Sequence, residues 1–508
     1  MFREGFVWGA GSSSYQIEGA ATQDGRLDSI WDALCRRQGA IHNAETGAIA
    51  CDHYNRYRED VGLMKRIGLK AYRLSIAWPR VMPTGVGPVN EKGLGFYDRL
   101  VDSLLASGIE PWITLYHWDM PQMLFERGGL LNRDFAQWFA DYSATVVDRL
   151  SDRVTRWITI NEPQVFISLG YGDAKHAPAL RLSFPEQLLA AHNCLLMHGR
   201  AAQIIRTRAK KKPIIGWAPV GRVDYPIDET PENIDAARTA SFSFNGKHFW
   251  SNNWFGDPAI LGHYPEEGLR HFAGDMPKFD PKDMDIIKQP LDFYGLNIYQ
   301  GTQIKRGANG QPENVPFPPG HALTTMRWPV APKSLYWGPR FHHERYKMPI
   351  VITENGMAGT DWVQSDGRVH DAHRIDFTRQ YLLELARASA DGVPVHGYFH
   401  WSVMDNFEWA EGYKERFGLI HVDYFTQKRT LKDSAHWYAE VIRTNGDHLS
   451  DTAPYLTLDA PKENAVVIPP REVAREVARD HALAASNGNG HTKHLVEAKV
   501  AARKGSTL

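Results

Sequence analysis

The chain has 508 residues, of which 58 are lysine or arginine and 59 are aspartate or glutamate, so its formal net charge is −1. This balance argues against nucleic acid or an anionic membrane as a partner. Apolar residues make up 43% and charged residues 23%, which is ordinary globular usage and argues against widespread disorder.

The three cysteines, Cys35, Cys51 and Cys194, are too few and too scattered for a disulfide framework or a clustered zinc site. We therefore expect free, mostly buried thiols. The first residues show no apolar leader, and no stretch approaches the roughly 18 apolar residues of a membrane span. These features predict a cytoplasmic protein.

Short β-branched or aromatic runs alternate with longer amphipathic stretches, which is the pattern of repeated βα units. Strands are predicted at 6–12, 70–76, 111–116, 154–160, 213–218, 291–299, 349–354 and 393–401. Helices are predicted between them, for example at 54–67, 95–107, 133–150, 185–208 and 372–390. Eight such units predict an α/β fold, a single (β/α)8 TIM barrel with long βα loops. The Pro- and Gly-rich segment 306–339 is expected to form one of these loops.

The character of the chain changes near residue 444, after which Asn-Gly and four prolines interrupt the pattern. We predict a catalytic barrel over 1–444 and an appended C-terminal extension over 445–508. Within the extension, 471–486 has the composition of a short charged helix and 486–490 that of a flexible linker. A solvated extension is favoured over a contact in a homo-oligomer, which stays open.

Two glutamates close predicted strands directly before a turn-forming residue. Glu162 follows the run 157–160 and precedes Pro163, and Glu354 follows the run 350–353. Active sites of β/α barrels lie where the strands end, and paired carboxylates there favour glycoside hydrolysis. A single glutamate in such a place is more often an ion-pair partner. The matching contexts of the pair favour catalysis.

Other strand ends carry groups suited to a sugar, which needs hydrogen-bonding partners around the ring and an aromatic platform beneath it. Each alone is a weak signal, because a lone buried His or Trp is more often part of a core. Together they predict a sugar site made of Gln16, His117, Trp118, Asn297, Tyr299, Trp401, Glu408 and Trp409.

Five motifs along the chain together indicate a protein family. They lie at 6–19 (FVWGAGSSSYQIEG), 117–122 (HWDMPQ), 159–163 (TINEP), 352–356 (ITENG) and 401–409 (WSVMDNFEW). These strings resemble the β-glucosidases of glycoside hydrolase family 1, and the resemblance covers roughly residues 2–443. It implies a hydrolase of carbohydrate metabolism and cellulose degradation.

The resemblance implies that Glu354 is the nucleophile and Glu162 the general acid/base of a retaining mechanism. Asn161 would bond the sugar 2-hydroxyl, and Arg73 with Tyr299 would orient the nucleophile and favour its ionised form. Glu162 must instead hold a proton near neutral pH, so its pKa has to lie above the usual value of about 4.3.

Substrate contacts follow from the same resemblance. The ring hydroxyls would be bound by Gln16, His117, Trp118, Asn161, Glu408 and Trp409, and Trp401 would stack beneath the ring. Further substrate-binding residues would be Asn297, Tyr299 and Phe417. Trp328 would be the platform for the aglycone. The chain has Ala174 and Ala179 where the family usually carries Gly, and the residues after Trp328 also differ, which puts leaving-group preference in doubt.

Members of the family that cleave 6-phosphorylated glycosides carry Ser at the position of Glu408, and Lys and Tyr at those of Glu415 and Phe417. This chain places two carboxylates where a phosphate would sit, and these would repel a dianion. An unphosphorylated sugar is therefore favoured.

The sequence thus predicts a retaining β-glucosidase that removes terminal non-reducing β-D-glucosyl residues from cellobiose-like or aryl and alkyl β-glucosides. Galactosyl and fucosyl preference stays open. The expected partner is a small-molecule carbohydrate, with no nucleic acid, membrane, metal or cofactor. One alternative is a predominantly transglycosylating β-glycosidase. Another is a catalytically silent sugar-binding barrel, which the presence of both Glu162 and Glu354 disfavours.

Overall fold

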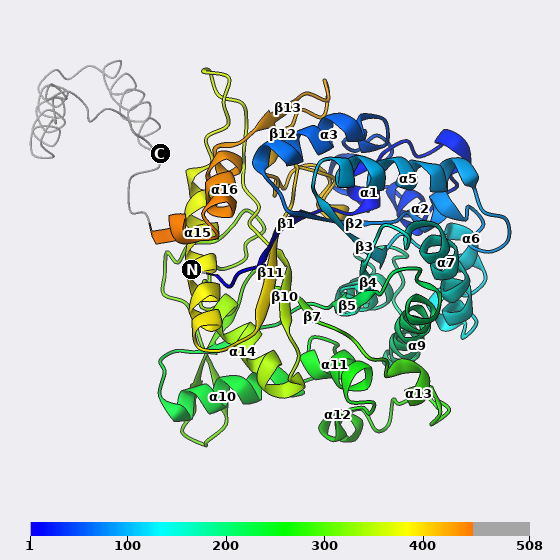
Figure 1. Cartoon of the computed structure of the whole chain (residues 1–508). Helices are drawn as coiled ribbons and strands as arrows, with labels where there is room; N and C mark the ends of the chain where they lie inside the picture. The colour runs from blue at the N-terminus through cyan, green and yellow to red at the C-terminus, as the bar shows by residue number, and fades with distance from the viewer. Residues whose placement is uncertain (1, 451–508) are drawn as a thin grey trace, which may run out of the picture. The chain divides into compact units, whose positions relative to one another are not determined.

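The computed structural model describes residues 2–450, which form a barrel of parallel strands surrounded by helices (Figure 1). The barrel strands are β1 (Val7–Gly11), β2 (Ala71–Ser75), β3 (Glu110–Tyr116), β4 (Arg156–Asn161), β5 (Ile214–Ala218), β7 (Tyr294–Asn297), β10 (Ile350–Asn355) and β11 (Val395–Trp401). Each coincides with one of the eight predicted strands. The predicted (β/α)8 fold is confirmed.

The strands lie in the order β5-β4-β3-β2-β1-β11-β10-β7, and every neighbouring pair is parallel. Backbone hydrogen bonds join the two ends of this sheet, among them that from the Asp292 N–H to the Ile215 carbonyl at 2.7 Å. The Gly221 N–H donates to the Asn297 carbonyl at 2.9 Å, and the Asn297 N–H donates to the Pro219 carbonyl at 3.1 Å. They close the sheet into a barrel and hold Asn297 at its rim.

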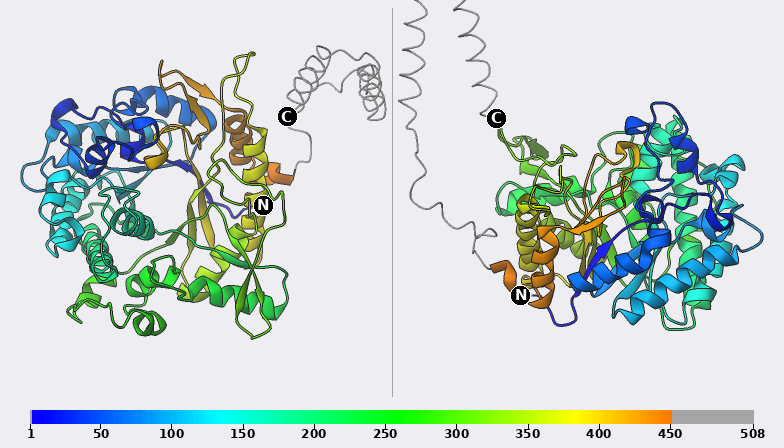
Figure 2. Two further views of the ribbon diagram at one scale, coloured as in Figure 1. Left: turned by 180° about the vertical axis from the view of Figure 1, so that it is seen from behind. Right: turned by 90° about the horizontal axis from the view of Figure 1, so that it is seen from above.

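The longer helices pack around the outside of the barrel (Figures 1 and 2). They are α3 (His53–Ile67), α5 (Glu91–Ala106), α7 (Phe135–Leu150), α9 (Phe184–Arg208), α14 (Ser334–Tyr346), α15 (Ala372–Ala390) and α16 (Asp433–Arg443). Further helices lie in the connections: α1 (Ser14–Ile17), α2 (Ile30–Cys35), α4 (Trp78–Val81), α6 (Gln122–Glu126), α8 (Pro163–Ile167), α10 (Pro231–Phe242), α11 (Asn252–Ile260), α12 (Glu266–His271) and α13 (Asp283–Ile287).

Local sequence explains where α9, the longest of these helices, begins. The Ser183 N–H donates to the Glu186 carboxylate at 2.9 Å, and the Ser183 hydroxyl donates to the same carboxylate at 2.6 Å. This is a capping box, and Pro185 in the first turn has no N–H that would need a partner. The sequence prediction of a helix at 185–208 therefore differs from the structure by one residue.

The interior of the barrel is filled by side chains. A separate buried cluster there consists of Ala71, Trp112, Ile158, Ala218, Phe293, Val351 and Phe399. The Trp112 ring centre lies 5.3 Å from that of Phe293 and 4.9 Å from that of Phe399. A Cβ at Gly9 would lie 2.5 Å from the Phe399 ring, so glycine is required at this point of β1. The barrel is a packed core, which leaves its end as the place for a pocket.

One expectation was wrong in part. The segment 306–339, predicted as a loop, contains β9 (Pro312–Val315) and the start of α14. β9 pairs antiparallel with β8 (Thr302–Arg306), which pairs with β6 (Asp224–Pro226). Proline and glycine indicated a loop, but Pro312 is the first residue of an edge strand and Gly310 (φ 77°) forms the turn before it. A second small sheet, β12 (Ile420–Val422) with β13 (Arg429–Leu431), also was not predicted.

The last described residues rest on the first strand. The Trp8 indole donates to the Asn445 side-chain oxygen at 3.0 Å, and the Asn445 amide donates to the Phe2 carbonyl at 2.9 Å. From residue 451 on, the predicted extension, including the helix at 471–486 and the linker at 486–490, lies outside the described residues. All three cysteines are buried and free, as expected. Within 2–450 no helix has the length and apolar character needed to span a membrane.

Candidate active site

A pocket of about 700 Å³ opens at the carboxyl ends of the barrel strands. Of the predicted site residues, the structure brings the following to its wall: His117, Trp118, Glu162, Asn297, Tyr299, Trp328, Glu354, Trp401, Glu408, Trp409 and Phe417. Gln16, Arg73 and Asn161 lie behind this wall, where they are fully buried and bond to residues that line it. The predicted residues, which run from Gln16 to Phe417 in the sequence, therefore meet at one end of the barrel.

Glu354, near the end of β10, is buried and held by two donors. The Arg73 guanidinium on β2 donates to one carboxylate oxygen, and the Tyr299 hydroxyl donates to the other at 2.5 Å. Burial raises the pKa of Glu354, while the charge of Arg73 and the Tyr299 hydrogen bond counteract this rise. The surroundings of Glu354 are thus built to accept its negative charge.

Glu162, directly after β4, has different surroundings. Its carboxylate accepts a hydrogen bond from the Asn297 amide at 2.9 Å, and the ion pairs of the described residues include none to it. Burial and the negative charge of Glu354 raise the pKa of Glu162 well above its ordinary value. The two carboxylates are therefore electrostatically unequal: Arg73 and Tyr299 counteract the rise in the pKa of Glu354, whereas the charge of Glu354 adds to the rise in the pKa of Glu162.

The backbone at this end of the barrel adopts an uncommon conformation. Glu162 has φ 46°, Trp118 has φ 77° and Trp409 has φ 50°, all in the left-handed region that side chains other than glycine rarely occupy. The Glu162 N–H donates to the Ala218 carbonyl at 2.8 Å, and Pro163 starts α8 immediately afterwards. These contacts fix the direction in which the Glu162 side chain leaves the strand.

Asn161 connects the two carboxylate sites. Its side-chain oxygen accepts from Arg73 at 2.5 Å and from Asn297 at 3.0 Å, and its amide contacts His117 Nε2 at 3.1 Å. Because the amide donates in this pair, Nε2 of His117 accepts. Burial and the charge of Arg73 lower the pKa of His117 well below its ordinary value, so the ring is neutral.

Glu408 and several tryptophans also line the pocket. Gln16 Nε2 donates to the Glu408 carboxylate at 3.1 Å. Burial, followed by the charge of Glu354, raises the pKa of Glu408 to about 8. Trp401 stacks on His117 with ring centres 5.8 Å apart, and Trp409 packs on Trp118 at 4.5 Å. Polar groups and aromatic faces thus surround one compact space, as a pyranose ring requires.

The mouth of the pocket is aromatic on one side. Trp328 lies 5.2 Å from Tyr299 and 6.2 Å from Phe417 between ring centres. Ala174 and Ala179 have φ 57° and φ 61°, which gives the physical reason why glycine suits these two positions.

Sequence reasoning missed a set of pocket residues in the connections that follow β4, β5, β7 and β11. They are Val165, Leu169, Lys175, His176, Val220, Gly221, Arg222, Val223, Asn245, His248, Trp250, Gln300, Gly301, Thr302, Met326 and Glu411. Most lie in connections that carry no periodic pattern, so no sequence signal points to them. Lys175 and His176 stand within the segment that departs from the family at Ala174 and Ala179.

Among residues 2–450, no group of three or more His, Cys, Asp or Glu side chains is placed to hold a metal ion. The buried carboxylates of the pocket are bonded to Arg73, Tyr299, Asn297 and Gln16 instead.

A (β/α)8 barrel that ends in a pocket with two unequal buried carboxylates and several tryptophans has the architecture of a glycoside hydrolase. The chain belongs to glycosyl hydrolase family 1, whose model matches residues 1–447.

Relatives in this family align along nearly their whole length. A 1,4-beta-D-glucan glucohydrolase of Thermotoga neapolitana is 43% identical over 447 residues, covering 88% of this chain and 99% of the relative. The aryl-phospho-beta-D-glucosidase BglC of Bacillus subtilis is 37% identical, covering 88% and 98%. The solved structure of a beta-glucosidase from Thermotoga maritima in complex with glucoimidazole is 42% identical, with a TM-score of 0.80 and coverage of 88% and 99%.

Proposed function

We propose that this chain is a retaining β-glucosidase that releases terminal β-D-glucosyl residues from small glycosides through a covalent glycosyl-enzyme. The observation that carries this proposal is the inequality of the two carboxylates. Glu354 is bonded to a cation and a phenol, whereas Glu162 has a raised pKa and an amide donor. Two carboxyl groups whose surroundings separate their pKa values are suited to opposite roles.

In the first step, an ionised Glu354 oxygen attacks the anomeric carbon while the bond to the leaving-group oxygen breaks. Glu162 transfers its proton to that oxygen, so the aglycone departs as a neutral alcohol. Arg73 and Tyr299 hold the attacking carboxylate in place.

In the second step, the negative charge of Glu354 has been consumed in the ester bond. The pKa of Glu162 therefore falls, and its carboxylate can take a proton from water. The water oxygen attacks the anomeric carbon, Glu354 leaves as a carboxylate, and two inversions give net retention.

We further propose that the sugar is unphosphorylated, although one relative is an aryl-phospho-beta-D-glucosidase. Glu415 is buried and Glu408 is half-buried, and Glu415 accepts a hydrogen bond from the Thr325 hydroxyl. The Lys414 ammonium lies 3.5 Å from Glu415 and also contacts Glu411. A phosphate dianion brought next to the Glu415 carboxylate would be repelled, and Glu408, whose pKa is raised to about 8, supplies no positive charge to offset that repulsion.

The test measures initial rates on the para-nitrophenyl β-glucoside, β-galactoside, β-fucoside, β-mannoside and 6-phospho-β-glucoside. The wild type is compared with Glu354→Gln and with Glu313→Gln, an exposed glutamate paired with Lys305. We expect turnover of unphosphorylated substrates with retained configuration, lost in Glu354→Gln and kept in Glu313→Gln. Silence of folded wild type on every substrate, or equal rates in all three proteins, would refute the proposal.

A further inference from the structure

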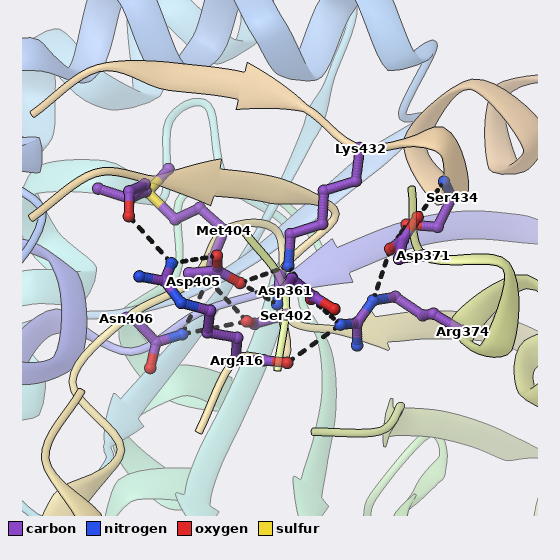
Figure 3. A network of polar contacts seen from close by, with 12 residues as sticks. Asp361, Asp371, Arg374, Ser402, Met404, Asp405, Asn406, Arg416, Lys432 and Ser434 are labelled. Atoms are coloured by element: carbon purple, nitrogen blue, oxygen red, sulfur yellow. Dashed lines mark hydrogen bonds and ion pairs between the residues drawn. The ribbon is translucent and has the colours of Figure 1, made fainter. Parts of the chain in front are cut away.

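Six charged side chains form a largely buried cluster around Lys432 (Figure 3). The Lys432 cluster, as we call it, contains three cations and three anions: Lys432, Arg374, Arg416, Asp361, Asp371 and Asp405. The side chains of Lys432, Arg374 and Asp405 have no exposed area. None of the six lines the pocket, and the two-step mechanism above does not use them.

Lys432 connects the loops that follow two neighbouring barrel strands. It lies between β13 and α16, and its ammonium contacts Asp361 at 2.5 Å and Asp405 at 2.6 Å (Figure 3). Asp361 stands in the loop after β10, seven residues beyond Glu354, and Asp405 stands in the loop after β11. One buried cation thus joins the loop that follows Glu354 to the loop that leads to Glu408.

Asp405 in turn holds both ends of the β11 loop together. Its carboxylate accepts from Arg416 at 2.7 Å and from the Gly418 N–H at 3.0 Å. The Ser402 N–H donates to the Phe417 carbonyl at 3.1 Å. The loop closed in this way carries Glu408, Trp409 and Phe417 to the pocket wall.

Arg374, on α15, anchors the loop after β10. Its guanidinium donates to Asp361, to the Met357 carbonyl and, at 3.1 Å, to the Arg416 carbonyl. The Gly359 N–H also donates to the Arg416 carbonyl at 2.9 Å, so the two loops touch directly. A shift of the Lys432 cluster would therefore move the Glu408 side of the pocket relative to Glu354.

Stability alone is a poor explanation of such a cluster. Taking charges out of water is costly, and apolar replacements of similar volume are often neutral or stabilising. A charged cluster instead defines one geometry, because each ammonium or guanidinium needs its carboxylates at a fixed distance and angle.

We propose that Lys432 is a positioning residue for recognition of the sugar, acting through Asp405 on the loop that carries Glu408 and Trp409. The inference rests on the proposed function, because it assigns these two residues to the sugar hydroxyls. It predicts that removing the Lys432 cation impairs discrimination between sugars more than it impairs the chemistry at Glu354.

The test uses Lys432→Met and the double variant Lys432→Met/Asp361→Asn. The double variant removes one cation and one anion, which leaves two of each and restores neutrality, yet it still lacks the bridge between the loops. Lys305→Met is the matched control, since Lys305 forms an exposed ion pair with Glu313 at 2.9 Å. For each protein, Tm is measured together with kcat and KM on para-nitrophenyl β-glucoside and on the β-xyloside, which lacks the 6-hydroxymethyl group.

We expect the ratio of kcat/KM for glucoside over xyloside to fall about tenfold in both Lys432 variants, mostly through KM, and to stay at the wild-type value in Lys305→Met. The double variant should recover Tm without recovering the ratio. A ratio that is unchanged, or that recovers together with Tm, would overturn the proposal. Failure of both variants to fold would overturn it as well, since the cluster would then serve folding. An inactive wild type would instead refute the proposed function.

Discussion

Replacing Tyr299 by phenylalanine removes one of the two side-chain donors to the Glu354 carboxylate and leaves Arg73 in place. The Tyr299 hydroxyl bonds the charged form of Glu354, so its loss favours the protonated form and raises the pKa of this carboxyl. Protonated Glu354 cannot attack the anomeric carbon. The acid limb of the pH profile must therefore move to higher pH.

The size of the shift follows from the hydrogen bond. A bond to a charged group contributes about 1.5–3 kcal/mol, and the half-buried Tyr299 favours the lower end of that range. One pKa unit corresponds to about 1.4 kcal/mol, so the limb should move by about one unit. At a pH one unit below the wild-type limb, Tyr299→Phe should then lose close to tenfold more activity than the wild type.

The assay is kcat/KM on an aryl β-glucoside over the full pH range in which the protein stays folded. Tyr294→Phe is the control, because Tyr294 is a buried tyrosine on β7, the strand that Tyr299 follows, and does not line the pocket. It should lose stability without moving the acid limb. An acid limb that stays in place in Tyr299→Phe, or moves to lower pH, would refute the assigned role of this hydrogen bond.

Three further predictions concern the carboxylates and the strand ends. Glu354→Gly should abolish hydrolysis, and added azide should restore turnover of the substrate. The configuration of the product, measured by NMR, should be inverted, and a product of retained configuration would contradict the assignment of Glu354 as the nucleophile. Glu162→Gln should lower kcat/KM on cellobiose by about 10²–10⁴ and on dinitrophenyl β-glucoside much less, and equal losses would exclude its role as acid. Gly356→Ala places a Cβ 1.9 Å from the Trp401 carbonyl oxygen, so we expect a lower Tm and at least about tenfold less activity. If Tm and activity both stay at their wild-type values, the ends of β10 and β11 can move apart at this point.

The fold could be predicted because barrel strands are short apolar runs between amphipathic helices, and this pattern is local in the sequence. The same reasoning located Glu162, Asn297 and Glu354, which follow or close such runs. Arg73 offered no comparable signal, since it stands in the middle of β2 and was found through the family resemblance. The outer pocket residues, such as Trp250, depend on how long connections fold over the barrel end.

The Lys432 cluster shows a second limit of sequence reasoning. Lys432, Asp361 and Asp405 come from three separate segments, and each on its own has the composition of a surface position. Their burial arises only when two loops and a helix start converge. Ion pairs between residues that are far apart in the sequence depend on the tertiary fold, so local sequence patterns do not predict them.

Because of the left-handed backbone at Glu162, Trp118 and Trp409, substitutions at these positions that raise thermostability are expected to lower turnover. A residue with a side chain in that conformation costs about 1–3 kcal/mol, and glycine or asparagine would relieve part of the cost. Selection for heat resistance alone would therefore enrich inactive replacements at these positions. Directed evolution of this protein should therefore measure hydrolysis in every round, because selection by melting temperature alone favours variants that have lost these pocket residues.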